Sequence, residues 1–179
     1  TAFGTEYGKV HARNLDTGED KVLLEGFAGG RYMPPGNLIY LDGARVLARA
    51  FNIDTLSFMG DPVEVTPIRY PASELMVSEF SVSPDGNMIY MSQGSGGSMT
   101  LEWVDSDSKH TPIDLPPNNY KNVRISPDNT RIAYDINNDI WTYELARGIT
   151  TRHTFSSDLE YTPIWTLDSR QLIYTMQGR

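Results

Sequence analysis

Residues 81–90 read SVSPDGNMIY, in which two short apolar stretches stand on either side of a Ser-Pro-Asp-Gly turn. Three other segments share this plan and also close on a tyrosine: RYMPPGNLIY (31–40), RISPDNTRIAY (124–134) and IWTLDSRQLIY (164–174). The four closing tyrosines are separated by 50, 44 and 40 residues. A phrase that returns at intervals of this length indicates a repeat architecture.

The middle of the phrase has the chemistry of a hairpin turn. Pro84 presets φ at the second turn position, Asp85 suits the third, and Gly86 accepts a positive φ. Asn129 stands in the place of Gly86 in the next copy and tolerates the same conformation. Leu167 replaces the proline in the last copy, so that turn is not required to share the geometry.

A second phrase with the β-branched and aromatic character of strands follows each hairpin: 10–15, 46–51, 99–104 and 140–145. A polar turn and a last short strand come after it, so each unit holds four antiparallel strands in about 40 to 50 residues. Such units predict an all-β fold, a β-propeller of four-stranded antiparallel blades. A β-sandwich, the alternative all-β fold, would not produce this repeat.

Composition excludes several classes of partner and chemistry. The formal charge is −8, and the fifteen Lys and Arg residues are scattered, so nucleic acid is not an expected partner. The absence of cysteine removes disulfides, thiolate zinc sites and thiol nucleophiles, and it fits either the cytoplasm or a bacterial periplasm. No stretch approaches the roughly 18 apolar residues of a membrane span, so no membrane insertion is expected.

The repeats FSVSPDGNMIYMSQ, VRISPDNTRIAYDINNDIWTYELARG and IWTLDSRQLIY resemble the TolB-like, WD40-like propeller repeats of bacteria. The segment 31–65 is also similar to blades of propellers attached to bacterial serine/threonine kinases. The resemblance implies a propeller over essentially the whole chain and suggests a periplasmic or other extracytoplasmic location, without excluding the cytoplasm. It implies less about function, because the family includes scaffolds, sensors and peptidase-gating domains.

We expect one propeller domain over residues 1–179, with about four blade equivalents. Its predicted parts are a partial blade (1–30), three blades (31–78, 79–117 and 118–157) and a second partial blade (158–179). The family usually closes six or more blades, so the chain is expected to be part of a larger propeller, with open blade edges able to pair with another copy. Alternatively, its last two strands complete a blade with its first two and close a ring of four.

No motif of a known catalytic class is present: H-E-x-x-H, G-x-S-x-G and the phosphate-binding loop are all missing. The three histidines lie on different repeats, and Gly94–Ser98 is expected to be a flexible connection. The turn aspartates Asp85, Asp128 and Asp168 are expected to serve their turns, since calcium needs six or more converging oxygens. We therefore predict no catalytic residue, no metal, no cofactor and no enzymatic activity.

Binding is predicted at the connections between blades. Each of these connections carries a tyrosine, and they share a face with the loops joining second to third strands. The predicted binding residues are Arg31, Tyr70, Tyr120, Lys121, Asn138, Glu160 and Tyr161. The leading hypothesis is a non-enzymatic module or scaffold that recognises a protein or peptide. The alternatives are tyrosines that only cover blade ends, a peptidase-gating propeller, and a ligand sensor of a signalling protein.

Overall fold

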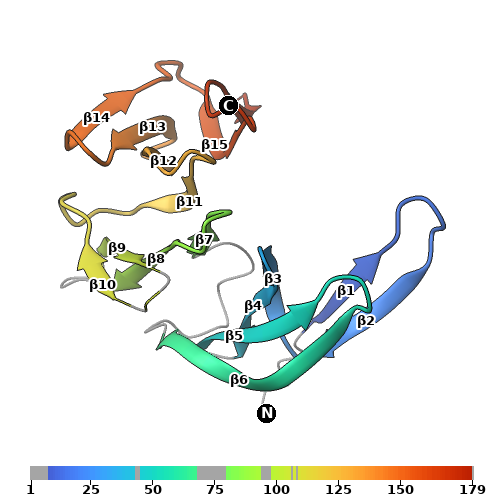
Figure 1. Cartoon of the computed structure of the whole chain (residues 1–179). Coiled ribbons are helices and arrows are strands. Elements are labelled where there is room, and N and C mark those ends of the chain that lie inside the picture. Colours follow the sequence, from blue (N-terminus) through green and yellow to red (C-terminus); the bar gives the residue numbers. More distant parts are fainter. Residues whose placement is uncertain are drawn as a thin grey trace, which may run out of the picture. The chain divides into compact units, whose positions relative to one another are not determined.

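The computed structural model describes residues 8–42, 45–67, 80–93, 98–105, 107 and 109–178. All regular elements within these ranges are β-strands (Figure 1). The chain divides into two compact units, Thr1–Val77 and Ser78–Arg179, and each is described by itself. The fold is a β-propeller built from four-stranded antiparallel blades, as the repeat predicts.

The first unit holds one complete four-stranded sheet and one strand pair. The pair is β1 (Lys9–Arg13) with β2 (Asp20–Glu25), and the sheet runs in sequence order through β3 (Ala28–Met33), β4 (Asn37–Asp42), β5 (Arg45–Asn52) and β6 (Ser57–Pro67). Its core includes the buried side chains Leu24, Leu38, Tyr40, Leu47 and Phe51. A Cβ at Gly30 would lie 2.7 Å from Cγ1 of Val10, so the close approach of β1 to β3 requires glycine there.

The second unit holds two complete sheets and one strand pair. The first sheet contains β7 (Phe80–Val82), β8 (Met88–Gln93), β9 (Met99–Val104) and β10 (His110–Pro112). The second contains β11 (Lys121–Ile125), β12 (Arg131–Ile136), β13 (Asp139–Glu144) and β14 (Ile149–Arg152). The pair is β15 (Leu159–Trp165) with β16 (Leu172–Gln177).

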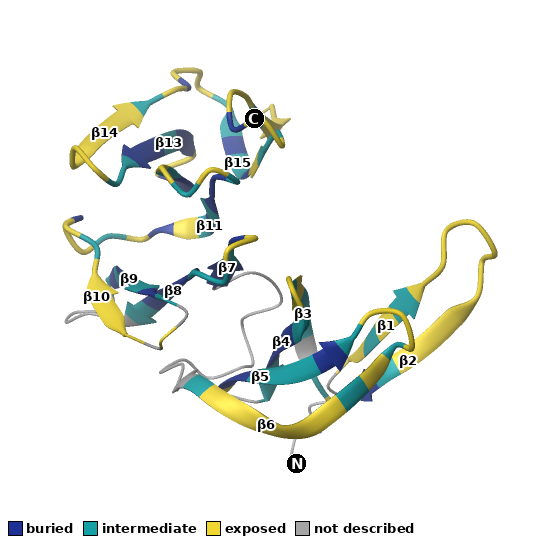
Figure 2. Cartoon of the chain, viewed as in Figure 1, coloured by how far each residue is buried: buried dark blue, intermediate teal, exposed yellow. Residues whose placement is uncertain are grey.

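Burial in the second unit is highest in the middle strands of each blade. In Figure 2, β12 and β13 are mostly buried, whereas β14 is mostly exposed. Fully buried Ile89, Leu101, Ile132 and Ile140 come from the second and third strands of the two blades. The core of each of these blades is therefore centred on its second and third strands.

Three of the four repeated hairpin turns share one geometry. In each, the fourth turn residue has a positive φ, which is 86° at Gly86, 57° at Asn129 and 58° at Ser169. The amides of these residues donate to the carbonyls of Ser83, Ser126 and Thr166, at 3.1, 2.9 and 2.9 Å. The turn with Leu167 therefore matches the two turns that contain Ser-Pro-Asp, although its sequence did not require this.

The turn aspartates do not all act in the same way. Asp128 Oδ1 accepts hydrogen bonds within its own turn from Ser126 Oγ (2.6 Å) and Thr130 Oγ1 (2.8 Å). Asp168 Oδ1 accepts in the same manner from Thr166 Oγ1 (2.6 Å). Asp85 Oδ2 instead accepts from Asn129 Nδ2 in the next blade, at 2.6 Å. Turn chemistry is thus the role of two of them, and the third links neighbouring blades.

A β-bulge recurs in the first strands β3, β11 and β15. The pairing register shifts there between Ala28 and Arg31, between Lys121 and Arg124, and between Tyr161 and Ile164. The second residue of each bulge has a positive φ: 65° at Gly29, 48° at Asn122 and 58° at Thr162. A bulge bends its strand and redirects the side chains beside it, and two of these three bulges border the site described next.

Candidate functional site

A cavity of about 470 Å³ opens among the connections of the second unit. We call it the loop-face cavity. It is lined by Asn119, Lys121, Asn122, Asp135, Ile136, Asn137, Asn138, Leu159, Glu160 and Tyr161. These residues come from the start of β11 and the residue two positions before it, the end of β12, the β12–β13 turn and the start of β15. Four of the seven predicted binding residues, Lys121, Asn138, Glu160 and Tyr161, therefore meet at one cavity.

The other three predicted residues lie elsewhere. Tyr120 is 3% exposed, donates its hydroxyl to the Pro116 carbonyl (2.5 Å) and packs edge-on against Tyr134, so the structure places it in the core. Arg31 belongs to the first unit, where its guanidinium donates to the Gly30 carbonyl at 3.1 Å. Tyr70 lies outside the described residues.

Asp135 connects three strands at the edge of the cavity. Its side chain is 5% exposed, and Oδ1 accepts hydrogen bonds from Asn122 Nδ2 (2.8 Å) and from the Thr162 amide (3.2 Å). Both donors are the positive-φ residues of bulges, one in β11 and one in β15. Burial raises the pKa of Asp135, and these hydrogen bonds only partly oppose that effect.

Glu160 is a buried side chain in which one of the two carboxylate oxygens has no hydrogen-bond partner among the described residues. It is 2% exposed, and its backbone amide donates to the Asn138 carbonyl at 2.9 Å. Oε1 accepts from Ser156 Oγ at 2.5 Å, but Oε2 is buried and meets no hydrogen-bond partner within the described part of the chain. A buried charge without compensation costs free energy, so this oxygen needs an explanation.

The repeated bulge shows how unusual this glutamate is. Glu160 directly precedes the bulge of β15, as Phe27 precedes that of β3 and Tyr120 precedes that of β11. Phe27 packs edge-on against the closing tyrosine Tyr40, with ring centroids 5.2 Å apart, and Tyr120 does the same with Tyr134 at 5.1 Å. The copy at β15 thus buries a carboxylate where the copies at β3 and β11 pack an aromatic ring.

Much of the remaining lining is polar and open to solvent. Asn137 and Asn138 form the β12–β13 turn with φ of 53° and 68°, the conformation of a type I′ hairpin, for which asparagine is well suited. The Lys121 ammonium is exposed, and the structure gives it no hydrogen-bonding or ion-pair partner among the described residues. The site therefore offers carboxamides, an ammonium and carboxylates to a ligand.

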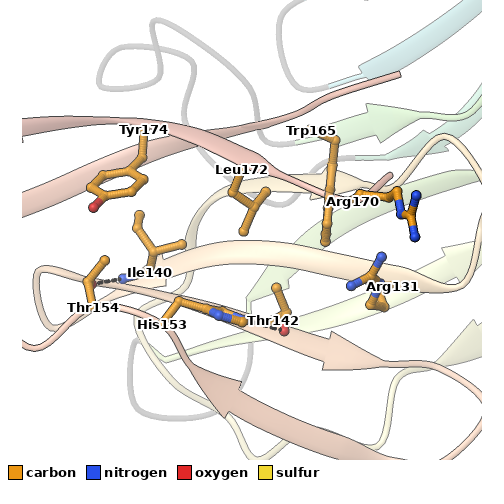
Figure 3. A pocket seen from close by; sticks show the side chains of 9 residues that line it. All are labelled: Arg131, Ile140, Thr142, His153, Thr154, Trp165, Arg170, Leu172 and Tyr174. Atoms are coloured by element: carbon orange, nitrogen blue, oxygen red, sulfur yellow. Dashed lines mark hydrogen bonds between the residues drawn. The ribbon is translucent and has the colours of Figure 1, made fainter. Parts of the chain in front are cut away.

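A second cavity of about 220 Å³ lies between the β11–β14 sheet and the β15–β16 pair (Figure 3). Its polar groups are largely satisfied by the protein. Arg131 donates to the Ser169 carbonyl and covers the Trp165 ring at 4.9 Å, while Thr142 Oγ1 lies 2.9 Å from His153 Nε2. Burial, with Arg131 nearby, lowers the pKa of His153. This cavity is better explained as inter-sheet packing, and the loop-face cavity is the candidate site.

Sequence reasoning missed Asp135, although a signal for it exists. Asp135 directly follows the closing tyrosine of its repeat, where the other copies carry Leu41, Met91 and Thr175. A carboxylate in such a strand position breaks the local pattern, and breaks of this kind tend to mark functional or strained sites. Asn119, Asn122 and Asn137 carried no comparable signal, because asparagine is common in turns.

Within the described ranges, no three His, Asp or Glu side chains converge as they would to hold a metal ion. His11 and His110 instead contact the acidic side chains of Asp20 (2.6 Å) and Glu102 (3.4 Å). The described residues also contain no helix of the length and hydrophobicity needed to cross a membrane.

Comparison with solved structures shows which proteins share the fold. The chain is similar to TolB from Acinetobacter baumannii (TM-score 0.71, 15% identity) and to a putative TolB from Agrobacterium tumefaciens (TM-score 0.72, 18% identity). Each match covers 97% of this chain but 45% and 65% of those chains, so the chain spans less than two thirds of their length.

The tricorn protease is also similar, with a TM-score of 0.59 and 14% identity over 93% of this chain and 17% of its own. No protein-family model and no curated protein matches the sequence. At these identities the comparisons establish a TolB-like β-propeller fold.

Proposed function

We propose that this chain is a non-enzymatic binding module that recognises a protein or peptide through the loop-face cavity. The observation that carries the proposal is Glu160, which lines this cavity and whose buried Oε2 has no hydrogen-bond partner among the described residues. A site that holds an unsatisfied polar group is poised for a ligand that supplies the missing partner.

A peptide suits the rest of the lining. The cavity volume of about 470 Å³ falls within the range typical of ligand sites. The carboxamides of Asn137 and Asn138 can donate to and accept from peptide groups, and Leu159 and Tyr161 add apolar and aromatic surface. Tyrosine is also among the residues that contribute most often to protein interfaces.

Catalysis is a weaker explanation of the same residues. The lining contains no serine, cysteine or histidine, so it lacks the usual nucleophile and its base. Asp135 and Glu160 could in principle form a pair of acid and base, but Asp135 Oδ1 already accepts two hydrogen bonds that join bulges. A carboxylate that holds two strands together through hydrogen bonds is poorly suited to exchanging protons with a substrate.

A second candidate is a propeller domain that serves a peptidase, since the tricorn protease shares this fold. In that case the cavity would contact a polypeptide substrate, and the chemistry would belong to residues outside this chain. A ligand-sensor domain of a signalling protein rests only on the resemblance of segment 31–65 to kinase-attached propellers.

Panning a phage-displayed random peptide library against the purified chain tests the binding function. Enriched peptides should bind at least about ten-fold more weakly to the Glu160→Gln variant, since one lost charged partner is worth about 1.4 kcal/mol or more. They should also bind more weakly to Tyr161→Ala, which removes aromatic contact surface. Glu19→Gln makes the same chemical change at an exposed position of the first unit and should leave affinity unchanged. Failure to enrich any peptide, or equal affinity in all variants, would contradict the proposal.

A further inference from the structure

We infer that Glu160 receives a primary ammonium group, so the recognised peptide presents a free N-terminus or a lysine side chain to the loop-face cavity. This inference rests on the proposed function, because it names the ligand chemistry of the same site. It begins from the one group in the cavity that is buried and incompletely bonded.

The missing partner of Glu160 must be a hydrogen-bond donor. An ionised carboxylate only accepts hydrogen bonds, and its Oε2 is buried without a partner among the described residues. A cationic donor would satisfy the oxygen and also neutralise the charge, which is worth more in a buried site than a neutral donor. The ligand group is therefore expected to be positively charged.

The cavity does not supply that cation itself. Lys121 is the one Lys or Arg in the lining, and the structure shows no ion pair between it and Glu160. Its ammonium acts instead on Asp135, where it helps to oppose the upward pKa shift caused by burial. Two carboxylates against one ammonium leave a negative lining in a chain of formal charge −8, and both attract a cation.

The geometry favours an ammonium over a guanidinium. Arginine binds carboxylates most strongly through two parallel hydrogen bonds, one to each oxygen. Oε1 of Glu160 already accepts from Ser156 Oγ at 2.5 Å, so a bidentate guanidinium would have to share this oxygen with Ser156, whereas Oε2 has no partner among the described residues. A compact ammonium can donate to this single oxygen and direct its other two hydrogens to nearby carboxamide oxygens, such as that of Asn138.

Small amines test the inference without knowledge of the natural peptide. Amide chemical shifts of the isotope-labelled chain are followed by NMR during titration with n-butylammonium, a mimic of lysine, and with glycinamide, a mimic of a peptide N-terminus. n-Butylguanidinium, n-butanol and sodium chloride serve as matched probes. We expect saturable shifts at Glu160, Tyr161 and Asn138 with at least one amine, and at least ten-fold weaker binding of the guanidinium and the alcohol.

Variants separate the carboxylate from general electrostatics. Glu160→Gln should weaken amine binding at least ten-fold, whereas Glu19→Gln should not change it. Lys121→Met should strengthen amine binding, because it removes a competing cation from the lining. If Glu160→Gln fails to fold, the comparison of amine with alcohol on the unmodified chain still decides the question.

The outcomes distinguish this inference from the function on which it rests. Peptides that bind through the cavity with affinities insensitive to acetylation of their amines would overturn the ammonium inference and leave peptide recognition in place. Amine shifts centred on Glu160 without any enriched peptide would support the ammonium site and overturn peptide recognition. Equal binding of n-butylammonium and n-butanol, or shifts that reproduce those of sodium chloride, would also overturn the inference.

Discussion

At the scale of single residues, Glu160 differs from its counterparts in other copies of the repeat because it buries a carboxylate. The copies that begin at β3 and β11 have Phe27 and Tyr120 in its place, and both rings pack on the closing tyrosine of their blade. The corresponding tyrosine in the copy that contains Glu160 is Tyr174, which is 43% exposed. A buried carboxylate in this position gives up ring packing and also carries a desolvation penalty.

Glu160→Phe is therefore expected to raise the free energy of unfolding by about 1–2 kcal/mol, the gain seen when buried ionic groups are replaced by apolar ones. Urea unfolding followed by tryptophan fluorescence is the appropriate measurement, because all three tryptophans lie in the second unit. Ser156→Ala should have the opposite effect, since it leaves both carboxylate oxygens without partners. A loss of stability in Glu160→Phe would show that the carboxylate is structural.

Asp135 should make the unfolding free energy of the second unit depend on pH. Burial raises its pKa in the folded chain, so its protonated form favours folding and its ionisation opposes folding. Asp135→Asn keeps an oxygen for Asn122 Nδ2 and the Thr162 amide while removing the charge. The variant should gain stability relative to the natural chain as pH rises from about 3.8, the ordinary value, through the raised pKa.

The measurement is the difference between the two unfolding free energies across pH 3.5 to 7. Carboxylates common to both chains cancel in that difference, so its slope reports Asp135. A flat difference would mean that ionisation of Asp135 does not oppose folding.

At the scale of elements, the recurrent bulge organises the site. Thr162 occupies its positive-φ position with φ of 58°, a conformation that is costly for a β-branched residue. Thr162→Gly should relieve that strain and raise the unfolding free energy by about 1 kcal/mol, because the backbone amide that bonds Asp135 is retained. Urea unfolding by fluorescence checks this value.

Thr151→Gly in β14 is the matched control, because Thr151 is an exposed strand residue outside the positive-φ set. It should lower the unfolding free energy by about 0.5–1 kcal/mol, the usual cost of glycine within a strand. Equal losses in the two variants would show that the Thr162 backbone is not strained.

The repeated turns provide a second test among elements. Burial of Asp128 alone would raise its pKa, but hydrogen bonds from Ser126 and Thr130 outweigh that effect and hold the pKa below its ordinary value. Asp128→Ala should cost about 1 kcal/mol at neutral pH, the typical net contribution of such hydrogen bonds. The difference should shrink as pH falls through the lowered pKa, because the natural carboxylate then loses its charge.

Urea unfolding at neutral and acid pH checks this prediction. Asp114→Ala alters an exposed aspartate between two blades and should change stability little at either pH. A cost for Asp128→Ala that is constant with pH would argue against a charged turn acceptor.

Sequence alone predicts the repeated elements well and the site only in part. Strands and turns depend on local residue chemistry, which is why β9 and β13 begin and end close to their predicted positions. The sequence did not predict the bulges of β11 and β15, because Asn122 and Thr162 resemble ordinary strand or turn residues. Tyr120 was predicted to face a partner, but the structure buries it against Tyr134, a tertiary contact that local residue chemistry does not reveal.

At the scale of the whole molecule, exposed strand surface bears on self-association. β16 forms a two-stranded sheet with β15, and its side chains are mostly exposed, including those of Ile173 (61%) and Met176 (60%). A strand of this kind can pair with another chain. We expect light scattering at about 100 µM to give a mass above the 20.1 kDa of one chain.

Met176→Lys should reduce that mass, because lysine on an exposed strand discourages pairing. Val63→Lys places the same charge on the exposed strand β6 of the first unit and should have a smaller effect. A natural chain that stays at the mass of one chain at every concentration would contradict self-association through β16.

The recurrent bulge also bears on how recognition could diversify in a chain of this design. Its backbone is maintained by glycine, asparagine or threonine, while the preceding position holds phenylalanine, tyrosine or glutamate. The backbone conformation of the bulge thus depends on one residue, and the side-chain chemistry beside it depends on the residue that precedes the bulge. A substitution at the preceding residue need not disturb the backbone of the bulge. Each repeat could then acquire its own preference by one exchange, so the chain would vary its selectivity in a modular way, one repeat at a time.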